Sequence, residues 1–215
     1  NTVDFDDSKW HGVGYRAVPS QNVVSQQVQP IRAVDTLTVK SWKQLNDTTY
    51  VFDFGQNMAG VTHIKVAGEA GTVIRMKHGE RLYENGKVNT SNIDVYHRPV
   101  DNSDPFQTDI LILSGKGEDE FVARFNYKGF RYVEVTSSKP ITLNKKSLTA
   151  YFVHSDVEKI GKVIASNEII NKLCKASDNS YLSNLMGYPT DCPQREKNGW
   201  TGDGHLAIET ALYNF

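Results

Sequence analysis

The apolar residues of this chain change their spacing once along its length, and this change limits the folds that the chain can adopt. Up to about Val153, short segments rich in β-branched and aromatic residues alternate with Gly, Asn, Asp and Pro, which is typical of antiparallel strands. From about Ser166, apolar residues recur at every third or fourth position, as on an amphipathic helix. The sequence therefore predicts a β domain followed by a helical one.

The first part is expected to contain short strands that pack as an antiparallel β-sandwich. Residues 130–135 alternate between apolar and polar side chains, which indicates one buried and one exposed face. Residues 80–104 are polar and too long for a hairpin turn, so they are interpreted as a surface excursion. The strands are expected at residues 36–40, 50–54, 62–66, 72–77, 108–113, 121–125, 130–135 and 148–152.

Two helices are expected in the second part. Ser166 is the expected N-cap of the first helix, which continues through Leu185 until Gly187 and Pro189 stop it. The second helix is expected to start near Asp203. Residues 191–203 are expected to join the two helices.

These patterns divide the chain into three portions. Residues 1–30 have weak periodicity and are interpreted as the trailing end of a preceding β domain. Residues 31–155 are the expected β-sandwich domain. Residues 156–215 contain only the two expected helices, which are interpreted as the truncated start of a helical domain.

The composition argues against several classes of partner. The chain has 24 Lys and Arg against 25 Asp and Glu, so it has no basic surplus for nucleic acid or anionic lipid. Its longest apolar stretches, such as residues 110–113, are far shorter than the roughly 20 residues that span a bilayer. Cys174 and Cys192 are too few for a disulfide framework, and neither metal-site spacing nor a phosphate loop occurs. We expect a soluble protein without nucleic acid, membrane, metal or cofactor, and the compartment stays open.

The densest group of chemically useful side chains lies between the two expected helices, in residues 191–203. Carboxylates and guanidinium groups hydrogen-bond the hydroxyls of sugars, an indole ring covers the apolar face of a sugar, and a carboxyl group can protonate a glycosidic oxygen. This combination is typical of a glycosidase. The candidate residues are Asp191, Arg195, Glu196, Trp200 and Asp203.

A purely structural interpretation of the same residues is the alternative. Asp203 would then cap the second helix, Trp200 would pack into the core, and Glu196 and Lys197 would be surface charges. Taken singly, each residue fits this interpretation at least as well as the functional one. The choice therefore depends on the loop as a whole.

As a whole, residues 191–203 read Asp-Cys-Pro-Gln-Arg-Glu-Lys-Asn-Gly-Trp-Thr-Gly-Asp and resemble a signature of α-L-rhamnosidases in glycoside hydrolase family 78. Residues 53–60 and 125–135 are similar to the opening and closing segments of the central β-sandwich in that family. Residues 78–82, His-Gly-Glu-Arg-Leu, are similar to a further segment, whose role is interpreted as structural. The resemblance implies a β-sandwich followed by the first helices of an (α/α)6 barrel.

The resemblance also implies roles for the loop residues. Glu196, the only Glu in the loop, would be the general acid, and Asp191, Arg195, Trp200 and Asp203 would bind the rhamnosyl ring. The general base would lie on a later loop of the barrel, in the remainder of the parent chain. The implied activity is inverting hydrolysis of rhamnose-containing glycosides without a cofactor, with these residues alone inactive. The rival hypothesis is a non-catalytic carbohydrate-binding or interface module, and a homo-oligomer is a further option.

Overall fold

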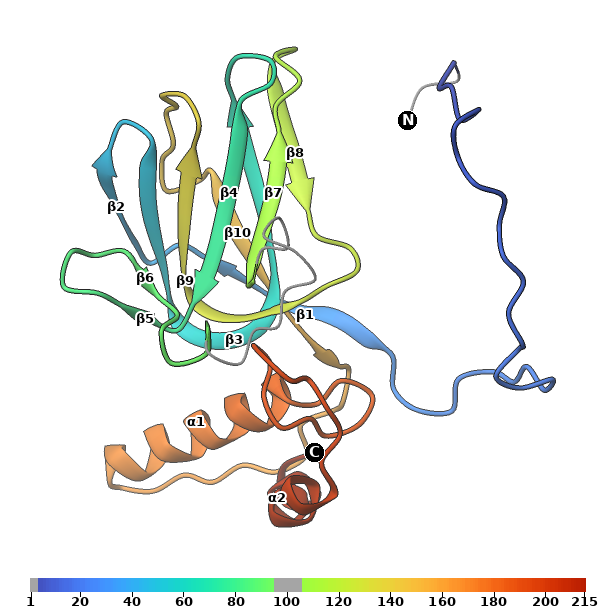
Figure 1. The fold of residues 1–215 in the computed structure, drawn as a ribbon. Coiled ribbons are helices and arrows are strands. Elements are labelled where there is room, and N and C mark those ends of the chain that lie inside the picture. Colours follow the sequence, from blue (N-terminus) through green and yellow to red (C-terminus); the bar gives the residue numbers. More distant parts are fainter. Residues whose placement is uncertain (1–3, 95–105) are drawn as a thin grey trace.

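The computed structural model describes residues 4–94 and 106–215, which form a strand-rich body with two helices at one end (Figure 1). The expected fold class, mostly antiparallel β followed by helices, is confirmed. The helices are α1 (Glu168–Ser183) and α2 (Thr201–Asn214). The strands are β1 (Ile31–Thr38), β2 (Ser41–Asn46), β3 (Thr49–Ala67), β4 (Val73–Gly79), β5 (Arg81–Leu82), β6 (Val88–Asn89), β7 (Thr108–Ile112), β8 (Glu118–Val122), β9 (Lys128–Ser137) and β10 (Leu148–Ser155).

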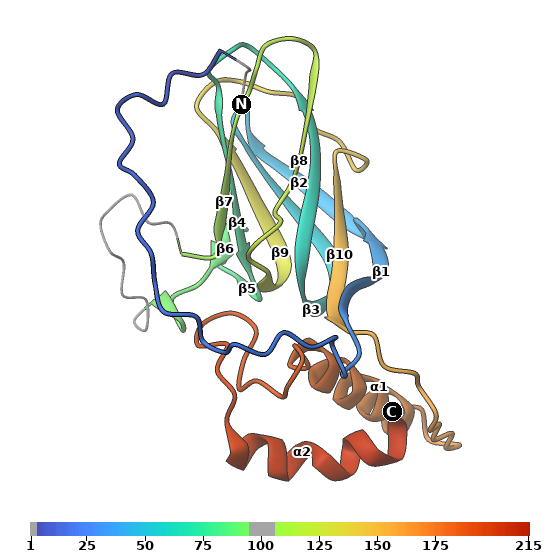
Figure 2. The same cartoon turned by 90° about the vertical axis from the view of Figure 1, so that its right-hand side faces the viewer.

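Within the described residues, eight strands form one curled antiparallel sheet around the long strand β3. The order is β1-β10-β3-β9-β4-β7, and β2 and β8 also pair with β3. The first part of β3 pairs with β2 and β9, whereas its last part pairs with β10 and β8. Because β3 changes partners along its 19 residues, it belongs to both layers of the sandwich (Figure 2).

The strand β3 changes partners at a bulge. Its register with β9 shifts between Asp53 and Met58, and Gly55 adopts a φ of 77°, which favours glycine. Asp53 Oδ1 accepts a hydrogen bond from Gly55 N at 2.6 Å, and the Asp53 carboxylate pairs with the guanidinium of Arg131 at 2.8 and 2.9 Å. The bulge therefore has a fixed shape at the end of the sheet that faces the helices.

The core lies between the two layers and is built from the inward-facing side chains of the strands. Phe52, Met58, Ile64 and Phe130 are wholly buried there. Fully burying one such side chain stabilises a fold by about 1.5–3 kcal/mol. The sandwich thus has an extensive apolar core of its own, which gives a rigid surface for the helical part to pack against.

Several strand bounds differ from the sequence-based expectation. The segments expected at 50–54 and 62–66 are both parts of β3, because the bulge between them does not end the strand. The strand β2 was not expected, since its side chains are mostly exposed and show no alternation. The strand expected at 121–125 is three residues off, because pairing with β3 places β8 at Glu118–Val122. The expected excursion contains the small hairpin β5–β6, and its residues 95–104 lie outside the described residues.

The helix ends also differ from the expectation. Asn167, not Ser166, is the N-cap of α1, and its Oδ1 accepts a hydrogen bond from Ile169 N at 2.9 Å. The helix α1 ends at Ser183, before Leu185, which forms a β-bridge with Pro189 instead. The helix α2 begins two residues before Asp203. In the described part of the chain, neither helix is long and apolar enough to cross a membrane.

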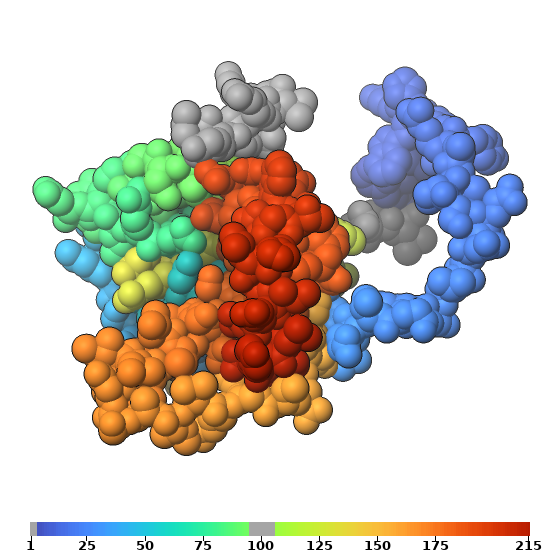
Figure 3. Space-filling view, turned by 90° about the horizontal axis from the view of Figure 1, so that it is seen from below, coloured from blue at the N-terminus to red at the C-terminus, as the bar shows by residue number. Residues whose placement is uncertain are grey.

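The helical part is hydrogen-bonded to the sandwich at the end of β10. Ser155 N, at the end of β10, donates to Leu185 O at 2.8 Å, and Gly187 N donates back to Ser155 Oγ at 2.8 Å. Leu182 packs against the core of the sandwich. Seen from the helical end, α2 lies outermost, across the molecule (Figure 3).

The segment before β1 takes no part in the sheet. Residues 4–29 are exposed, contain no strand and run apart from the sandwich (Figure 1). Their interpretation as the trailing end of a preceding β domain stays a prediction.

Candidate active site

The loop between α1 and α2 is closed on itself by Asp191. Asp191 N donates to Asn198 O at 3.0 Å, and Asp191 Oδ1 accepts from Asn198 N at 3.0 Å. Its other carboxylate oxygen accepts from Cys192 Sγ at 2.8 Å. Asp191 therefore sets the width of a loop whose tip carries Arg195 and Glu196.

Arg195 and Glu196 lie side by side at the tip of this loop. Arg195 Nε is 3.5 Å from Glu196 Oε1, and the two side chains are 32% and 35% exposed. A carboxyl group in this position is within reach of a molecule that arrives from solvent, and the neighbouring guanidinium can hydrogen-bond the hydroxyls of that molecule.

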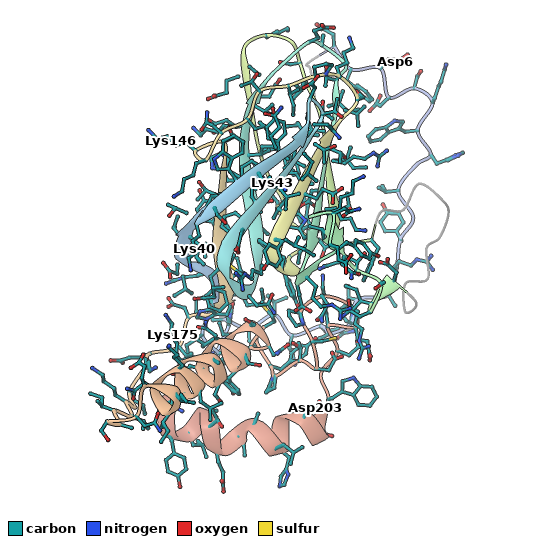
Figure 4. The ribbon with its side chains drawn as sticks, turned by 90° about the vertical axis from the view of Figure 1, so that its left-hand side faces the viewer. Asp6, Lys40, Lys43, Lys146, Lys175 and Asp203 are labelled. Carbon is teal, nitrogen blue, oxygen red and sulfur yellow. The ribbon has the colours of Figure 1, made fainter. Side chains whose placement is uncertain are left out.

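Asp191 and Asp203 share a cavity. Asp203, in the first turn of α2, is exposed, and together with Asp191 and Thr190 it lines a hollow of about 220 Å³ (Figure 4). Asp191 also lines a larger cavity of about 610 Å³ between α1 and the bulge of β3. The two expected sugar-binding carboxylates thus line the same cavity.

Trp200 lies at the N-cap position of α2 and is 51% exposed. Its indole lines a separate hollow of about 590 Å³ together with Tyr188 and His205. The alternative interpretation is therefore wrong on two points, because Trp200 does not pack into the core and Asp203 does not occupy the N-cap. An exposed indole beside a hollow is an arrangement that suits the apolar face of a sugar.

The sandwich holds the loop at Gln194. Glu80, at the end of β4, accepts a hydrogen bond from Asn57 Nδ2 at 2.7 Å and one from Gln194 Nε2 at 3.3 Å. Pro193 and Gln194 pack directly on Gly129 of β9, where a Cβ would lie 2.9 Å from both side chains. A glycine at this position lets the loop approach the sheet closely.

The sandwich holds the loop a second time at Lys197. Lys197 Nζ donates to Asn126 Oδ1 at 2.8 Å and to Tyr127 O at 2.6 Å, and it lies 4.4 Å from the centre of the Tyr127 ring. The interpretation of Lys197 as a surface charge is therefore wrong. Burial, followed by repulsion from Lys128, lowers the pKa of Lys197 to about 8, and burial raises the pKa of Tyr127 to about 12.

A buried polar cluster lies beneath this contact. Lys128 of β9 pairs with Asp109 of β7, and Asp109 lies 4.0 Å from the ring of the wholly buried His78. Thr62 Oγ1 lies 3.0 Å from His78 Nε2, and Gln107 O lies 3.1 Å from His78 Nδ1. Both contacts fit the neutral ring, and burial lowers the pKa of His78 to about 4.

The sequence indicates the loop residues but not the residues that support the loop, which are Asn57, Glu80, Asn126, Tyr127 and Lys197. Asn57, Glu80, Asn126 and Tyr127 lie in segments that resemble the family's sandwich, but the resemblance does not indicate that they contact the loop. In residues 4–94 and 106–215, no group of three or more His, Cys, Asp or Glu side chains is placed to hold a metal ion.

Comparison with known proteins assigns both parts of the chain. Residues 43–154 match the bacterial alpha-L-rhamnosidase concanavalin-like domain, and residues 158–215 match the bacterial alpha-L-rhamnosidase 6 hairpin glycosidase domain. A concanavalin-like sandwich that leads into a six-hairpin glycosidase domain defines a class of glycoside hydrolases. Within that class the chain belongs to the bacterial α-L-rhamnosidase family, which confirms the resemblance to α-L-rhamnosidases.

Individual relatives agree with this assignment. An alpha-L-rhamnosidase of Formosa agariphila is 30% identical over 100% of this chain, and one of Alteromonas sp. is 33% identical over 98%. The structure of the Dictyoglumus thermophilum α-L-rhamnosidase superposes with a TM-score of 0.84 at 40% identity over 99% of this chain and 23% of its own. The Streptomyces avermitilis enzyme complexed with L-rhamnose gives a TM-score of 0.79 at 32% identity over 98% of this chain and 20% of its own. The chain spans 22% of the length of the two curated relatives.

Proposed function

We propose that the protein containing this chain is an α-L-rhamnosidase that removes terminal α-L-rhamnosyl residues from glycosides or polysaccharides with inversion. One observation carries the proposal. In a chain of this family, Glu196 lies accessible at the tip of a loop that is held to the sandwich on both sides, at Gln194 and at Lys197. A carboxyl group needs such a fixed place if it is to protonate a leaving oxygen.

Glu196 is the proposed general acid, and Arg195 orients both it and the sugar. Inverting hydrolysis needs one carboxylic acid on the leaving-group oxygen and one carboxylate that activates water on the opposite face, about 6.5–9.5 Å away. The second carboxylate is proposed to come from the part of the relatives' length that this chain does not span. No metal or organic cofactor takes part in this step.

The remaining loop residues are proposed to hold the rhamnosyl ring. Asp191 and Asp203 face a common cavity, and each carboxylate oxygen has lone pairs for ring hydroxyls, even where one already accepts a bond from the loop. Trp200 offers its exposed indole to an apolar face of the sugar. These roles are those of a site that binds one terminal sugar.

The test is an assay of the full-length protein on an aryl α-L-rhamnoside, with rhamnose binding measured in parallel. The expected result is hydrolysis in which β-L-rhamnose is the first product, seen by proton NMR before the anomers equilibrate. Release of α-L-rhamnose first would contradict inversion. Binding of rhamnose without any hydrolysis would instead favour a non-catalytic carbohydrate-binding module.

A further inference from the structure

The loop that carries Glu196 has two anchors on the sandwich, one on each side of Arg195 and Glu196. On the N-terminal side, Gln194 bonds to Glu80 and packs on Gly129. On the C-terminal side, Lys197, which directly follows Glu196, hydrogen-bonds through its side chain to Tyr127 O of the sandwich.

The ammonium group of Lys197 makes three contacts with the Asn126–Tyr127 corner of the sandwich. It donates to Asn126 Oδ1 and to Tyr127 O, at 2.8 and 2.6 Å, and it lies 4.4 Å from the centre of the Tyr127 ring. A cation over an aromatic face adds to the strength of the two hydrogen bonds, more so when the cation is partly removed from water. The backbone of Lys197 has a φ of 57°, a left-handed conformation that a Lys seldom adopts. The surrounding contacts therefore fix both the main chain and the side chain at this position.

We propose that Lys197 is a positioning residue for the general acid, which fastens the loop after Glu196 to the Asn126–Tyr127 corner of the sandwich. This inference rests on the proposed function. Lys197 acts through Glu196 and not on the substrate, because its ammonium group is turned toward the sheet. The sandwich is thereby part of the catalytic apparatus, since it sets the place of the acid.

The charges around Lys197 make the anchor sensitive to pH. Lys128 faces it from β9 and lowers its pKa, while Asp109 from β7 and Cys192 from the loop raise it; burial is the largest influence and brings the pKa to about 8. Above that pH the ammonium group loses its proton, and the attraction to the Tyr127 ring is lost with it. An arginine at this position stays charged and keeps the attraction.

The experiment compares Lys197→Met and Lys197→Arg with the unchanged full-length enzyme on two substrates. One is an alkyl rhamnoside, whose leaving group needs a proton, and the other is a dinitrophenyl rhamnoside, whose leaving group does not. We expect Lys197→Met to lower kcat on the alkyl rhamnoside by about 10- to 100-fold and on the dinitrophenyl rhamnoside by less than about threefold. We expect Lys197→Arg to restore most of the loss and to keep its activity above pH 8, where the unchanged enzyme declines.

Three controls separate a positioning role from a general loss of structure. Lys146→Met removes an exposed charge at the opposite end of the sandwich and is expected to have no effect (Figure 4). Rhamnose affinity is expected to stay unchanged in Lys197→Met, while the amides of the loop at residues 195–198 exchange hydrogen faster. Asn126→Ala, which removes one acceptor and leaves Lys197 in place, is expected to give a smaller loss with the same substrate preference.

The outcomes distinguish this inference from the proposed function. An unchanged enzyme that does not cleave either rhamnoside would overturn the function itself. An active enzyme in which Lys197→Met and Asn126→Ala lose nothing, or lose equally on both substrates, would overturn only the positioning role. Should Lys197→Met not fold, the substrate preference of Asn126→Ala and Lys197→Arg decides the matter.

Discussion

Glu196 is the residue on which the proposed reaction depends most directly. Replacing it by Gln keeps the size of the side chain but removes the transferable proton. We expect Glu196→Gln in the full-length enzyme to slow hydrolysis of rhamnosides with poor leaving groups by about 100-fold or more, and to slow dinitrophenyl rhamnoside hydrolysis much less. The matched control is Glu84→Gln, at an exposed position in the β5–β6 turn, which should leave both rates unchanged. Equal losses on both substrates in Glu196→Gln would rule out the role of general acid.

Asp191 and Asp203 differ in the hydrogen bonds that their side chains make within the protein. The side chain of Asp203 makes no hydrogen bond within the described residues, whereas the Asp191 carboxylate accepts bonds from Asn198 N and Cys192 Sγ. We expect Asp203→Ala to weaken rhamnose binding by about 1.5–3 kcal/mol, the contribution of a hydrogen bond to a charged group, and to lower stability by no more than about 1 kcal/mol, through loss of its charge in the first turn of α2. Asp191→Ala should weaken binding and also destabilise the loop. Calorimetric titration and thermal unfolding of the two variants check this, and unchanged sugar affinity in both would contradict it.

His78 gives the sandwich a pH-dependent stability. Its ring is wholly buried, and burial lowers its pKa in the folded protein to about 4 from the ordinary value of 6.5. Between these values the unfolded chain binds a proton that the folded chain does not, so stability falls as the pH falls from 6.5 to 4. We expect a loss on the order of 3 kcal/mol from this group. Urea unfolding at pH 7 and pH 4 should show a smaller pH effect in His78→Gln, and an equal effect in both proteins would contradict the assignment.

At the scale of elements, the close approach of the loop to β9 depends on a missing side chain. A Cβ on Gly129 would lie 2.9 Å from Pro193 Cγ and from Gln194 Cβ, and 3.0 Å from Gln194 N. Since backbone is among these atoms, the loop itself must move. We expect Gly129→Ala to destabilise the protein by about 1–3 kcal/mol, as overpacking does, and to lower the hydrolysis rate as well. Gly12→Ala, where nothing lies within 4 Å, should do neither when both variants are compared by urea unfolding and by assay.

The elements themselves were predictable to different degrees. The strand β10 alternates between buried and half-buried positions, whereas β9 is buried or half-buried throughout and was indicated by its aromatic and β-branched residues rather than by alternation. The strand β2 is exposed on most positions and is held by its pairing with β3, which local sequence does not record. The two strands expected on either side of Gly55 are one strand, because Arg131 helps to hold the bulge by pairing with Asp53, 78 positions away. Tertiary pairing, rather than local propensity, decides these cases.

At the scale of the whole molecule, the candidate site joins parts of the chain that are far apart in sequence. The loop residues could be found because they form one contiguous string with an unusual composition. Their supports could not, because Glu80 meets Gln194 across 114 positions and Asn126 meets Lys197 across 71. Nothing in the local pattern of Glu80 or Asn126 indicates such a partner. Only the fold of the sandwich against the helices brings them together.

The helices also leave much apolar surface uncovered. Ile169 and Leu173 on α1 are 74% and 67% exposed, and Leu206 on α2 is 84% exposed. No residue of α2 is buried. Leu182 is the exception, because it packs against the core of the sandwich. Helices that expose this much apolar surface need a further partner, either more of the same domain or another molecule.

We therefore predict that residues 1–215 alone neither hydrolyse rhamnosides nor stay monomeric. The proposed acid catalysis by Glu196 needs a second carboxylate on the opposite face of the sugar, and the loop at 191–203 lies on only one side of such a gap. The exposed side chains of α1 and α2 should drive association, because burying apolar area yields about 25 cal/mol per Å². The measurement is a comparison of this segment with the full-length protein by light scattering and by assay on an aryl rhamnoside. A monomeric segment with the turnover of the full-length protein would contradict both parts of the prediction. The general base would then lie within residues 1–215, and the apolar faces of α1 and α2 would need no partner.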